Sequence, residues 1–511
     1  MHHQVESQDA VFSLMGDPAT HGGNRVERID THAAAVFLAG ERAYKIKRAV
    51  RFPFLDYGDL AKRKAACAAE LEVNRAFAPD IYRRIVAITR EASGLALDGG
   101  GKPVEWAVEM RRFDVDATLD RLAAKGRIDP GLADALARAV AAAHAKLPVV
   151  EAAPWLEALA RFIAQNAEEF AESPDLFPAD AVAALTRASR DALTRVTPLL
   201  RKRGSRGLIR RGHGDLHLGN IVLIDGQPVA FDAIEFDPLI AAGDVLYDLA
   251  FLLMDLVERG LGGAANVVLN RYLTETRREE DLDALAALPL FLSLRAAIRA
   301  KVTAARRETA TNENKDAIAK SARSYFDLAC ALIAPPPARL IAVGGLSGTG
   351  KSVLAAALAP EIAPAPGAVV LRSDVKRKAM FGIAETEKLP AEAYRPEVTT
   401  KLYRALAAKA RRVMAAGHSA IVDAVFSKPE ERELLTSAAG PLTGLFLVAD
   451  LATRVARVGK RVEDASDADA AIARQQENYD LGTLDWRRVD ANGNPSDTLA
   501  HARAALKLSS A

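Results

Sequence analysis

The chain has 511 residues, of which 50% are hydrophobic and 26% charged. This length exceeds what one compact core usually holds, so we expect two or three domains. The 68 Lys and Arg residues nearly balance 66 Asp and Glu, giving a net charge of +2, which offers no support for nucleic-acid or membrane binding through bulk charge. Two cysteines, Cys67 and Cys330, favour a reducing compartment and exclude a disulfide framework or a zinc cluster of cysteines.

The beginning of the chain and its apolar stretches indicate a soluble protein. Residues 1–10, MHHQVESQDA, are polar and include Glu6 and Asp9, so they do not resemble a secretory signal. The most apolar stretches, residues 246–257 and 287–294, are too short to span a bilayer. We therefore expect a cytoplasmic protein that has no membrane partner.

The first predicted elements form a small lobe that is rich in strands. Within residues 26–50, two apolar runs flank a turn at Gly40, which indicates a β-hairpin. Residues 59–78 have a helical pattern, and residues 104–113 alternate as a strand does. Together these elements predict a small lobe over about residues 25–110.

The sequence that follows is mostly helical, with one interruption. Residues 116–200 predict helices, residues 207–236 predict short strands and turns, and helical sequence returns after residue 243. Strands first and helices later describe a bilobal α+β domain. We expect this domain to cover residues 1–334, with a large lobe over about residues 111–334.

The segment HGDLHLGN, residues 213–220, concentrates residues that suit phosphoryl-transfer chemistry. In kinases one Asp accepts the acceptor's hydroxyl proton, an Asn binds Mg²⁺, and a later Asp binds Mg²⁺ across the phosphates. Asp215, Asn220 and Asp232 occur in this order, although a polar turn between strands is the alternative. His217 either braces the loop or faces the substrate. Zinc is not expected, because no Cys or His partners stand at zinc spacing.

These motifs resemble the aminoglycoside phosphotransferase family, whose core signature is H-G-D-x-x-x-x-N followed by a strand and an Asp. The resemblance covers about residues 25–330 and includes GDVLYDLAFLL, residues 243–253. It implies a kinase-like fold that uses ATP and Mg²⁺. It also implies that Asp244 and Asp248 brace the catalytic loop from a following helix.

The same resemblance implies a lysine in the small lobe that holds the α- and β-phosphates. Lys45 and Lys47 in AYKIK alternate onto one face of a strand, so the sequence does not choose between them, and we favour Lys45. Glu70 in the following helix is the implied ion-pair partner. No G-x-G-x-x-G loop precedes these lysines, because the glycines of residues 21–30 have another spacing.

Three consecutive prolines, residues 335–337, mark the clearest domain boundary, because they stiffen a linker and cannot lie inside a helix. Helical sequence precedes them, and the apolar run RLIAVGG, residues 339–345, follows. Four apolar strands alternate with helices over residues 338–511. This alternation predicts an α/β domain with a parallel sheet and helices on both faces.

Residues 345–352, GLSGTGKS, match the phosphate-binding pattern G-x-x-x-x-G-K-[ST], with a strand before them and a helix after them. Glycines let backbone N–H groups turn toward phosphate oxygens, and the helix N-terminus adds its dipole. Lys351 is expected to reach the β- and γ-phosphates and Ser352 to ligate Mg²⁺; an ordinary glycine-rich turn is the alternative. The predicted nucleotide-binding residues are Gly345, Ser347, Gly348, Thr349, Gly350, Lys351 and Ser352.

Two carboxylates near the ends of predicted strands suit a transferase. Asp374 can orient or deprotonate an acceptor hydroxyl, and Arg377 can hold an anionic substrate. Asp423 ends an apolar strand, where a carboxylate can hold metal-bound water. The alternatives are a helix N-cap for Asp374 and a plain strand end for Asp423.

Arg454, Arg457 and Arg461 share one helical face by their spacing. Such a face can neutralise charge on a transferring phosphoryl group, and a solvated face is the alternative. With the P-loop, Asp374-x-x-Arg377 and the strand ending at Asp423, residues 338–511 resemble P-loop kinases of the zeta-toxin, gluconate-kinase and polynucleotide-kinase-like group. The resemblance implies that Asp374 is the acceptor-side base and that the arginines belong to a lid.

The whole arrangement resembles a bacterial family described as bifunctional aminoglycoside phosphotransferase/ATP-binding proteins. The leading hypothesis is a kinase with two nucleotide-binding domains, each transferring a phosphoryl group from Mg·ATP to a small-molecule hydroxyl. The alternative is a P-loop kinase, zeta-toxin-like and acting on a nucleotide sugar, regulated by a poorly active, ligand-sensing N-terminal domain. We expect no nucleic-acid partner, and nothing in the sequence identifies the acceptors or the oligomeric state.

Overall fold

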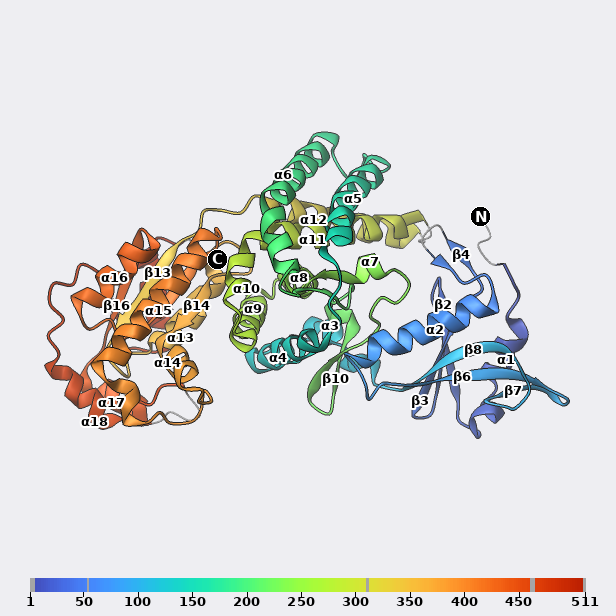
Figure 1. Cartoon of the computed structure of the whole chain (residues 1–511), viewed down its shortest axis with the longest axis horizontal. Helices are drawn as coiled ribbons and strands as arrows, with labels where there is room; N and C mark the ends of the chain where they lie inside the picture. Colours follow the sequence, from blue (N-terminus) through green and yellow to red (C-terminus); the bar gives the residue numbers. More distant parts are fainter. Residues whose placement is uncertain (1–4, 53–54, 309–311, 460–464, 509–511) are drawn as a thin grey trace. The chain divides into compact units, whose positions relative to one another are not determined.

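The computed structural model describes residues 5–52, 55–308, 312–459 and 465–508 (Figure 1). The chain forms two compact units. The first unit consists of Met1–Asn166 and Thr197–Asp255, and the second of Ala167–Val196 and Leu256–Ala511. The second unit therefore combines helices that precede the proline segment with the sheet that follows it.

The N-terminal sheet of the first unit contains the predicted hairpin. Its strands run antiparallel in the order β1-β2-β3-β8-β6-β7, over a core that includes Phe37, Ile46 and Val86. Gly40 lies in the tight turn between β2 and β3, so the predicted hairpin is confirmed, and the predicted strand over residues 104–113 is β8. The strands are β1 (Val26–Asp30), β2 (Ala34–Ala39), β3 (Arg42–Lys47), β6 (Tyr82–Glu91), β7 (Gly94–Leu97) and β8 (Lys102–Arg111).

Helix α2 (Leu60–Arg75) packs on β6 and β8 and confirms the helix predicted over residues 59–78. It begins after Asp59, whose carboxylate accepts a hydrogen bond from the backbone N–H of Lys62 at 2.8 Å, the usual N-cap arrangement. The turn between β1 and β2, residues 31–33, contains no glycine. The glycines of residues 21–30 therefore lie before β1 and outside this turn.

Helices dominate the remainder of the first unit, as predicted, and short strands flank the HGDLHLGN segment. This segment lies between β9 and β10, and β10 pairs with β11 in a hairpin. The main elements are α3 (Leu119–Ala124), α4 (Pro130–Lys146), β9 (Ile209–Arg211), β10 (Ile221–Ile224), β11 (Gln227–Ala230), β12 (Ala242–Asp244) and α8 (Val245–Glu258).

The second unit begins with a helical layer. The ring centroid of Phe326 lies 5.2 Å from those of Phe170, near the end of α5, and Phe177, in the following turn, which ties this corner to α12. None of the helices in the described part of the chain is long and apolar enough to span a membrane. The helices are α5 (Ala152–Ala171) and α6 (Ala179–Gly204), which each have residues in both units, α9 (Gly262–Thr276), α10 (Glu279–Asp283), α11 (Leu288–Ala305) and α12 (Asn312–Ile333).

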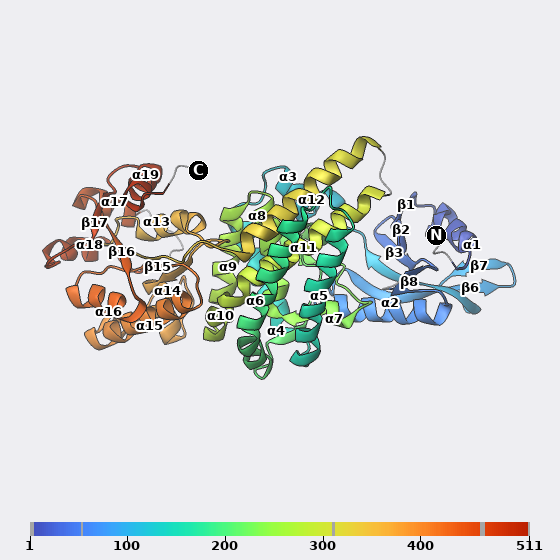
Figure 2. The ribbon, with the colours of Figure 1, turned by 90° about the horizontal axis from the view of Figure 1, so that it is seen from above.

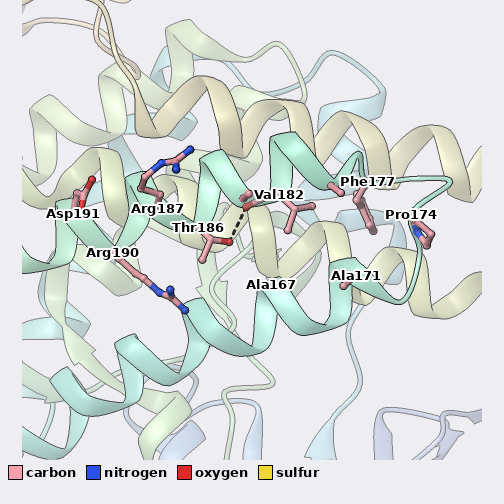
Figure 3. A pocket seen from close by; sticks show the side chains of 11 residues that line it. Ala167, Ala171, Pro174, Phe177, Val182, Thr186, Arg187, Arg190 and Asp191 are labelled. Carbon is pink, nitrogen blue, oxygen red and sulfur yellow. Dashed lines mark hydrogen bonds between the residues drawn. The ribbon is translucent and has the colours of Figure 1, made fainter.

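An open groove of about 600 Å³ lies between α5 and α6 within the second unit (Figure 3). Ala167, Ala171 and Val182 line its apolar part, and the side chains of Arg187 and Arg190 lie toward one end. None of the site residues predicted from the sequence lines this groove.

The sheet of the second unit is fully parallel, as predicted, with the order β14-β15-β13-β16-β17. Every residue of β13 and β15 is buried, which is why these strands appear as unbroken apolar runs. The fifth strand, β17, was not predicted. The strands are β13 (Leu340–Gly345), β14 (Val369–Arg372), β15 (Ala420–Asp423), β16 (Leu442–Val448) and β17 (Arg487–Asp490).

Helices alternate with these strands and flank the sheet (Figures 1 and 2). Helix α13 follows β13 after a five-residue loop, and α14 follows β14 directly, so both begin at the carboxyl ends of parallel strands, where α/β proteins place their ligands. The helices are α13 (Lys351–Leu358), α14 (Ser373–Phe381), α15 (Pro396–Ala415), α16 (Pro429–Ala439), α17 (Leu451–Gly459), α18 (Ala470–Gln475) and α19 (Pro495–Leu506).

Candidate active sites

In the first unit, Lys45 on β3 bridges two carboxylates. Its Nζ lies 2.7 Å from Oε1 of Glu70 on α2 and 2.6 Å from Oδ1 of Asp232. Lys47, two positions along the same strand face, binds the other oxygen of Glu70 at 2.7 Å and also pairs with Glu235. Of the two lysines, Lys45 is thus the one that joins the α2 carboxylate to the predicted metal-binding aspartate.

Glu70 and Lys47 of this cluster are buried, Lys45 is largely buried, and their opposite charges compensate one another. Burial alone lowers the pKa of Lys45, but the negative charges of Asp232 and Glu70 outweigh it and raise that pKa well above its ordinary value. Burial likewise raises the pKa of Glu70, but Lys45 and Lys47 outweigh it and the net pKa is lowered. Lys45 and Glu70 therefore both remain charged at neutral pH.

The HGDLHLGN segment forms a compact loop around Asp215. The Nδ2 of Asn220 donates to the backbone carbonyl of Asp215 at 3.0 Å and to its Oδ2 at 2.9 Å. His217 accepts a hydrogen bond from the backbone N–H of Gly219 through Nδ1, so its Nε2 carries the proton and faces Oδ2 of Asp215 at 3.4 Å. His217 therefore braces the loop, and it also contacts the predicted catalytic carboxylate.

Asp248 on α8 holds the start of this loop, as predicted. Its two carboxylate oxygens accept from the backbone N–H groups of His213 and Gly214, each at 2.9 Å, and His144 lies 3.2 Å away. Gly214 has φ +79°, a conformation that strongly favours glycine. His213 is fully buried, which lowers its pKa, and its Nε2 donates to the carbonyl of Phe231.

The predicted role of Asp244 in bracing the loop is wrong. Its carboxylate instead forms a buried bidentate pair with Arg203 of α6, at 2.5 and 2.8 Å. The second brace comes from Asp255, two turns further along α8, whose Oδ2 accepts from the backbone N–H of Leu218 at 2.9 Å. Residues seven apart lie on the same side of a helix, so Asp248 and Asp255 both point toward the loop.

Asp232 adopts a left-handed backbone conformation, with φ +61°. Asp tolerates this region better than most residues, and here its N–H donates to the hydroxyl of Tyr82 at 3.0 Å. Its side chain is 47% exposed and keeps one oxygen on Lys45. A carboxylate held in this way remains accessible to a metal ion.

In the second unit, residues 345–352 form a phosphate cradle between β13 and α13. Gly345, Gly348 and Gly350 have φ of +142°, +87° and +90°, conformations that L side chains rarely adopt. A Cβ on Gly348 would stand 2.5 Å from the carbonyl oxygen of Arg454, so the loop passes α17 too closely for any larger residue. The Nζ of Lys351 donates to the carbonyl of Leu346 at 3.2 Å, across the loop.

The two predicted metal-binding residues of this unit lie together. The hydroxyl of Ser352, in the first turn of α13, donates to Oδ2 of Asp423 at the end of β15, at 2.6 Å. Burial raises the pKa of Asp423, and the nearby charges of Lys351 and Arg372 act against this rise. A serine oxygen beside a buried carboxylate at a P-loop is a donor set that suits Mg²⁺.

The structure places Asp374 in the first turn of α14, after Arg372, which is the N-cap. Asp374 is therefore neither the strand end nor the N-cap that the sequence suggested. Arg377, one turn later, is 8% exposed; its Nη1 donates to the carbonyl of Ala393 at 2.6 Å, and its guanidinium lies 5.0 Å from the ring centroid of Tyr394. Part of the Arg377 guanidinium is thus occupied by contacts within the protein.

The three predicted lid arginines do not share one environment. Arg454 is buried, and its Nη2 binds the carbonyl of Ala473 and the carboxylate of Glu477, which excludes a solvated face at this position. Its Nε and Nη1 are also buried and have no hydrogen-bond partner among the described residues. Arg457 instead donates to the carbonyls of Ala491 and Gly493, and Arg461 lies outside the described residues.

Two family models match separate parts of the chain. Residues 61–288 match the phosphotransferase enzyme family, and residues 340–481 match the AAA domain. The chain joins a phosphotransferase-family domain to an AAA-type P-loop domain. The first match contains Glu70, Asp215, Asn220 and Asp232 but begins after Lys45, and the second contains the whole P-loop.

Relatives and solved structures are similar to this chain over part or most of its length. An uncharacterized protein of Mycobacterium tuberculosis (strain H37Rv) is 28% identical over 480 residues, covering 91% of this chain and 92% of the relative. Aminoglycoside 2'-phosphotransferase-IIIa is similar to 63% of the chain over 99% of its own length, with 13% identity and a TM-score of 0.35. A gluconokinase from Sinorhizobium meliloti is similar to 34% of the chain over 92% of its length, with 22% identity and a TM-score of 0.24.

Sequence reasoning missed a contact at the loop of the AAA-type P-loop domain. The Oε1 of Gln476, which is 6% exposed, accepts from the backbone N–H of Ser347 at 2.6 Å. Gln476 stands beside Glu477, the partner of Arg454. The segment after α18 thus holds both the loop and its buried arginine, and two adjacent glutamines in a polar stretch give no sign of this.

Proposed function

We propose that the phosphotransferase-family domain transfers the γ-phosphoryl group of ATP to a small-molecule hydroxyl. The observation that carries this proposal is the position of Lys45 between Glu70 and Asp232, because it joins a phosphate-holding lysine to its helix carboxylate and to a metal-binding aspartate in one cluster. Asn220, bound to Asp215, completes the set.

Each residue of this set has a distinct proposed role. Asp215 accepts the hydroxyl proton as the acceptor oxygen bonds to the γ-phosphorus and the bond to the ADP oxygen breaks. Asn220 and Asp232 hold Mg²⁺, and Lys45 holds the α- and β-phosphates. Bound Mg²⁺ supplies charge neutralisation on the phosphate oxygens. His217 orients Asp215 and borders the acceptor.

We propose the same class of reaction for the AAA-type P-loop domain. The glycine cradle and Lys351 hold the phosphates, and Ser352 and Asp423 hold Mg²⁺, supported by their 2.6 Å contact. Asp374 is the proposed acceptor-side base, with Arg377 beside it. Arg454 is proposed to stabilise charge on the phosphoryl group, because two of its buried nitrogens have no partner among the described residues. We propose residues 335–337 as the border between the phosphotransferase-family domain and the AAA-type P-loop domain.

One observation favours a second function for the phosphotransferase-family domain. The turn between β1 and β2 contains no glycine, whereas kinases use backbone N–H groups of a glycine-rich loop to cover the phosphates. A domain that holds nucleotide weakly can serve as a ligand sensor for the P-loop kinase. This candidate predicts binding without turnover at Asp215.

The experiment compares full-length protein with Asp215→Asn and Lys351→Ala variants in Mg·ATP and a pooled metabolite extract, following phosphorylated products by mass. We expect each variant to lose one product and keep the other. Asp80→Asn and Lys401→Ala, at exposed positions, are the matched controls. Unchanged products in Asp215→Asn would favour the sensor, and unchanged products in Lys351→Ala would refute the P-loop assignment.

A further inference from the structure

Helix α9 holds the edge strand of the parallel sheet in the second unit. The side-chain amide of Asn270 pairs with β14 as a neighbouring strand would: its Oδ1 accepts from the N–H of Val370 at 2.7 Å, and its Nδ2 donates to the carbonyl of Ala368 at 3.1 Å. Asn266, which is 3% exposed, donates to the same carbonyl at 3.0 Å. These contacts satisfy backbone groups that an edge strand otherwise leaves unpaired.

The same helix reaches a second segment of the P-loop domain. Arg271, next to Asn270, forms an ion pair of 2.9 Å with Glu385. Glu385 lies in residues 382–390, between α14 and the short 3₁₀ helix Ala391–Tyr394. Arg271 is 21% and Glu385 31% exposed, so the pair is partly shielded from water.

The segment that Arg271 holds takes part in a polar network around the buried side chain of Lys378. The Nζ of Lys378 on α14 donates to the carbonyl of Glu385 at 2.6 Å and pairs with Asp467 at 3.1 Å. Asp467 in turn accepts from the N–H of Leu389 at 3.0 Å and from the hydroxyl of Tyr394 at 2.7 Å. Because Lys378 is only 1% exposed, it depends on these acceptors for compensation.

This network ends at the proposed acceptor side of the P-loop site. Tyr394 lies against the guanidinium of Arg377, and Arg377 follows Asp374 by one turn of α14. An ion pair at Arg271 therefore fixes one end of a chain of contacts whose other end borders the proposed base. None of these contacts involves the phosphate cradle of residues 345–352.

We propose that Arg271 is a positioning residue for acceptor binding in the P-loop domain, acting through Glu385 on the segment that carries Tyr394. The inference rests on the proposed kinase function of that site. It gives the helical layer before the proline segment a part in the second reaction. Removing the pair should loosen the acceptor side and leave nucleotide binding as it is.

The test uses full-length Arg271→Ala and Arg271→Lys, with Arg412→Ala as the matched control. Arg412 joins α15 to Glu279 and Asp283 of α10, so it is another ion pair between the helical layer and the P-loop domain, but it does not touch residues 382–394. The acceptor is the substrate from which the Lys351-dependent product of the metabolite assay is formed. Its KM, the KM for ATP and kcat are measured, together with amide hydrogen exchange of residues 382–394.

We expect Arg271→Ala to raise the acceptor KM about three- to tenfold and to speed exchange of residues 382–394, with the KM for ATP unchanged. Arg271→Lys should stay close to wild type in both acceptor KM and exchange of residues 382–394, and Arg412→Ala should show neither change. Faster exchange without a change in acceptor KM would make the pair merely structural and overturn the inference, as would unchanged exchange. If wild-type protein yields no Lys351-dependent product, the proposed function fails and the positioning role falls with it, and faster exchange in Arg271→Ala would then show only that the ion pair orders residues 382–394.

Discussion

Replacing Glu70 with Gln removes the carboxylate that stands between Lys45 and Lys47. Removing one partner of a buried ion pair usually destabilises a protein by about 3–5 kcal/mol. Because Lys45 keeps Asp232 and Lys47 keeps Glu235, we expect the lower end of this range, about 3 kcal/mol. For a unit of this size, that corresponds to a fall in melting temperature of about 6–12 °C.

The pH dependence of this loss gives an independent check. Burial raises the pKa of Glu70, but the two lysines outweigh it, so its pKa in the folded protein lies below the ordinary value of 4.5. The stability that the carboxylate contributes is therefore complete above about pH 4.5 and lost as the pH falls below it. The difference in stability between wild type and Glu70→Gln should shrink in the same range.

The assay is thermal and urea unfolding of the full chain at several pH values, with the Asp215-dependent KM for ATP measured in parallel. Glu72→Gln, at an exposed position two residues along the same helix, is the control and should change stability by less than about 0.5 kcal/mol. We also expect the KM for ATP to rise, because Lys45 loses the partner that fixes it beside the phosphates. A loss of unfolding free energy below about 1 kcal/mol, or a loss that does not shrink at acid pH, would refute the buried ion pairs of Glu70 with Lys45 and Lys47.

Three further substitutions test a proposed metal-binding carboxylate, a loop brace and a buried ion pair beside the loop. Asp423→Asn should raise the Mg²⁺ concentration needed for the Lys351-dependent product by about 10- to 100-fold, measured by titrating Mg²⁺ at fixed ATP. Asp248→Asn weakens the hold on two backbone N–H groups and should lower Asp215-dependent turnover at least about tenfold, with a stability loss of about 1–3 kcal/mol by urea unfolding. Arg203→Ala leaves Asp244 buried without its bidentate partner and should destabilise the chain by about 3–5 kcal/mol; a loss below about 1 kcal/mol would contradict that burial.

The contiguous motifs could be predicted because their chemistry lies in short stretches of chain. The P-loop needs glycines, Lys351 and Ser352 within eight residues, and the strand before it appears as an apolar run because both of its faces are buried. The spacing of Asp215 and Asn220 is likewise local, and their side chains do bond to each other. The roles of these residues in catalysis remain predictions.

Features that depend on the direction in which a side chain points, rather than on sequence spacing, could not be predicted. Arg454 and Arg457 are three positions apart, and side chains at that spacing diverge by about 60° around a helix, which is enough to bury Arg454 and turn Arg457 toward the carbonyl of Ala491. Asp244, predicted as a brace on the helix, instead ends strand β12 and pairs with Arg203, and Asp255 on α8 takes that place. Short β17 has one buried residue among four, so its sequence carries no strand period.

The two proposed sites share a way of preparing a carboxylate for a metal ion. Asp232 is held by Lys45 and by its own backbone bond to Tyr82, and Asp423 is held by the hydroxyl of Ser352. Each contact fixes a side chain that would otherwise lose rotamer freedom on binding, which lowers the entropic cost of ligand association. The two sites differ in the nearest partner of the carboxylate. Asp232 is held by the charged Lys45, which must also bind the phosphates, whereas the nearest partner of Asp423 is the neutral hydroxyl of Ser352, and its cation, Arg372, lies further away at 3.6 Å. Mg·ATP affinity should therefore depend more strongly on ionic compensation in the phosphotransferase-family domain, which is why Glu70 is the residue whose replacement tests that site most directly.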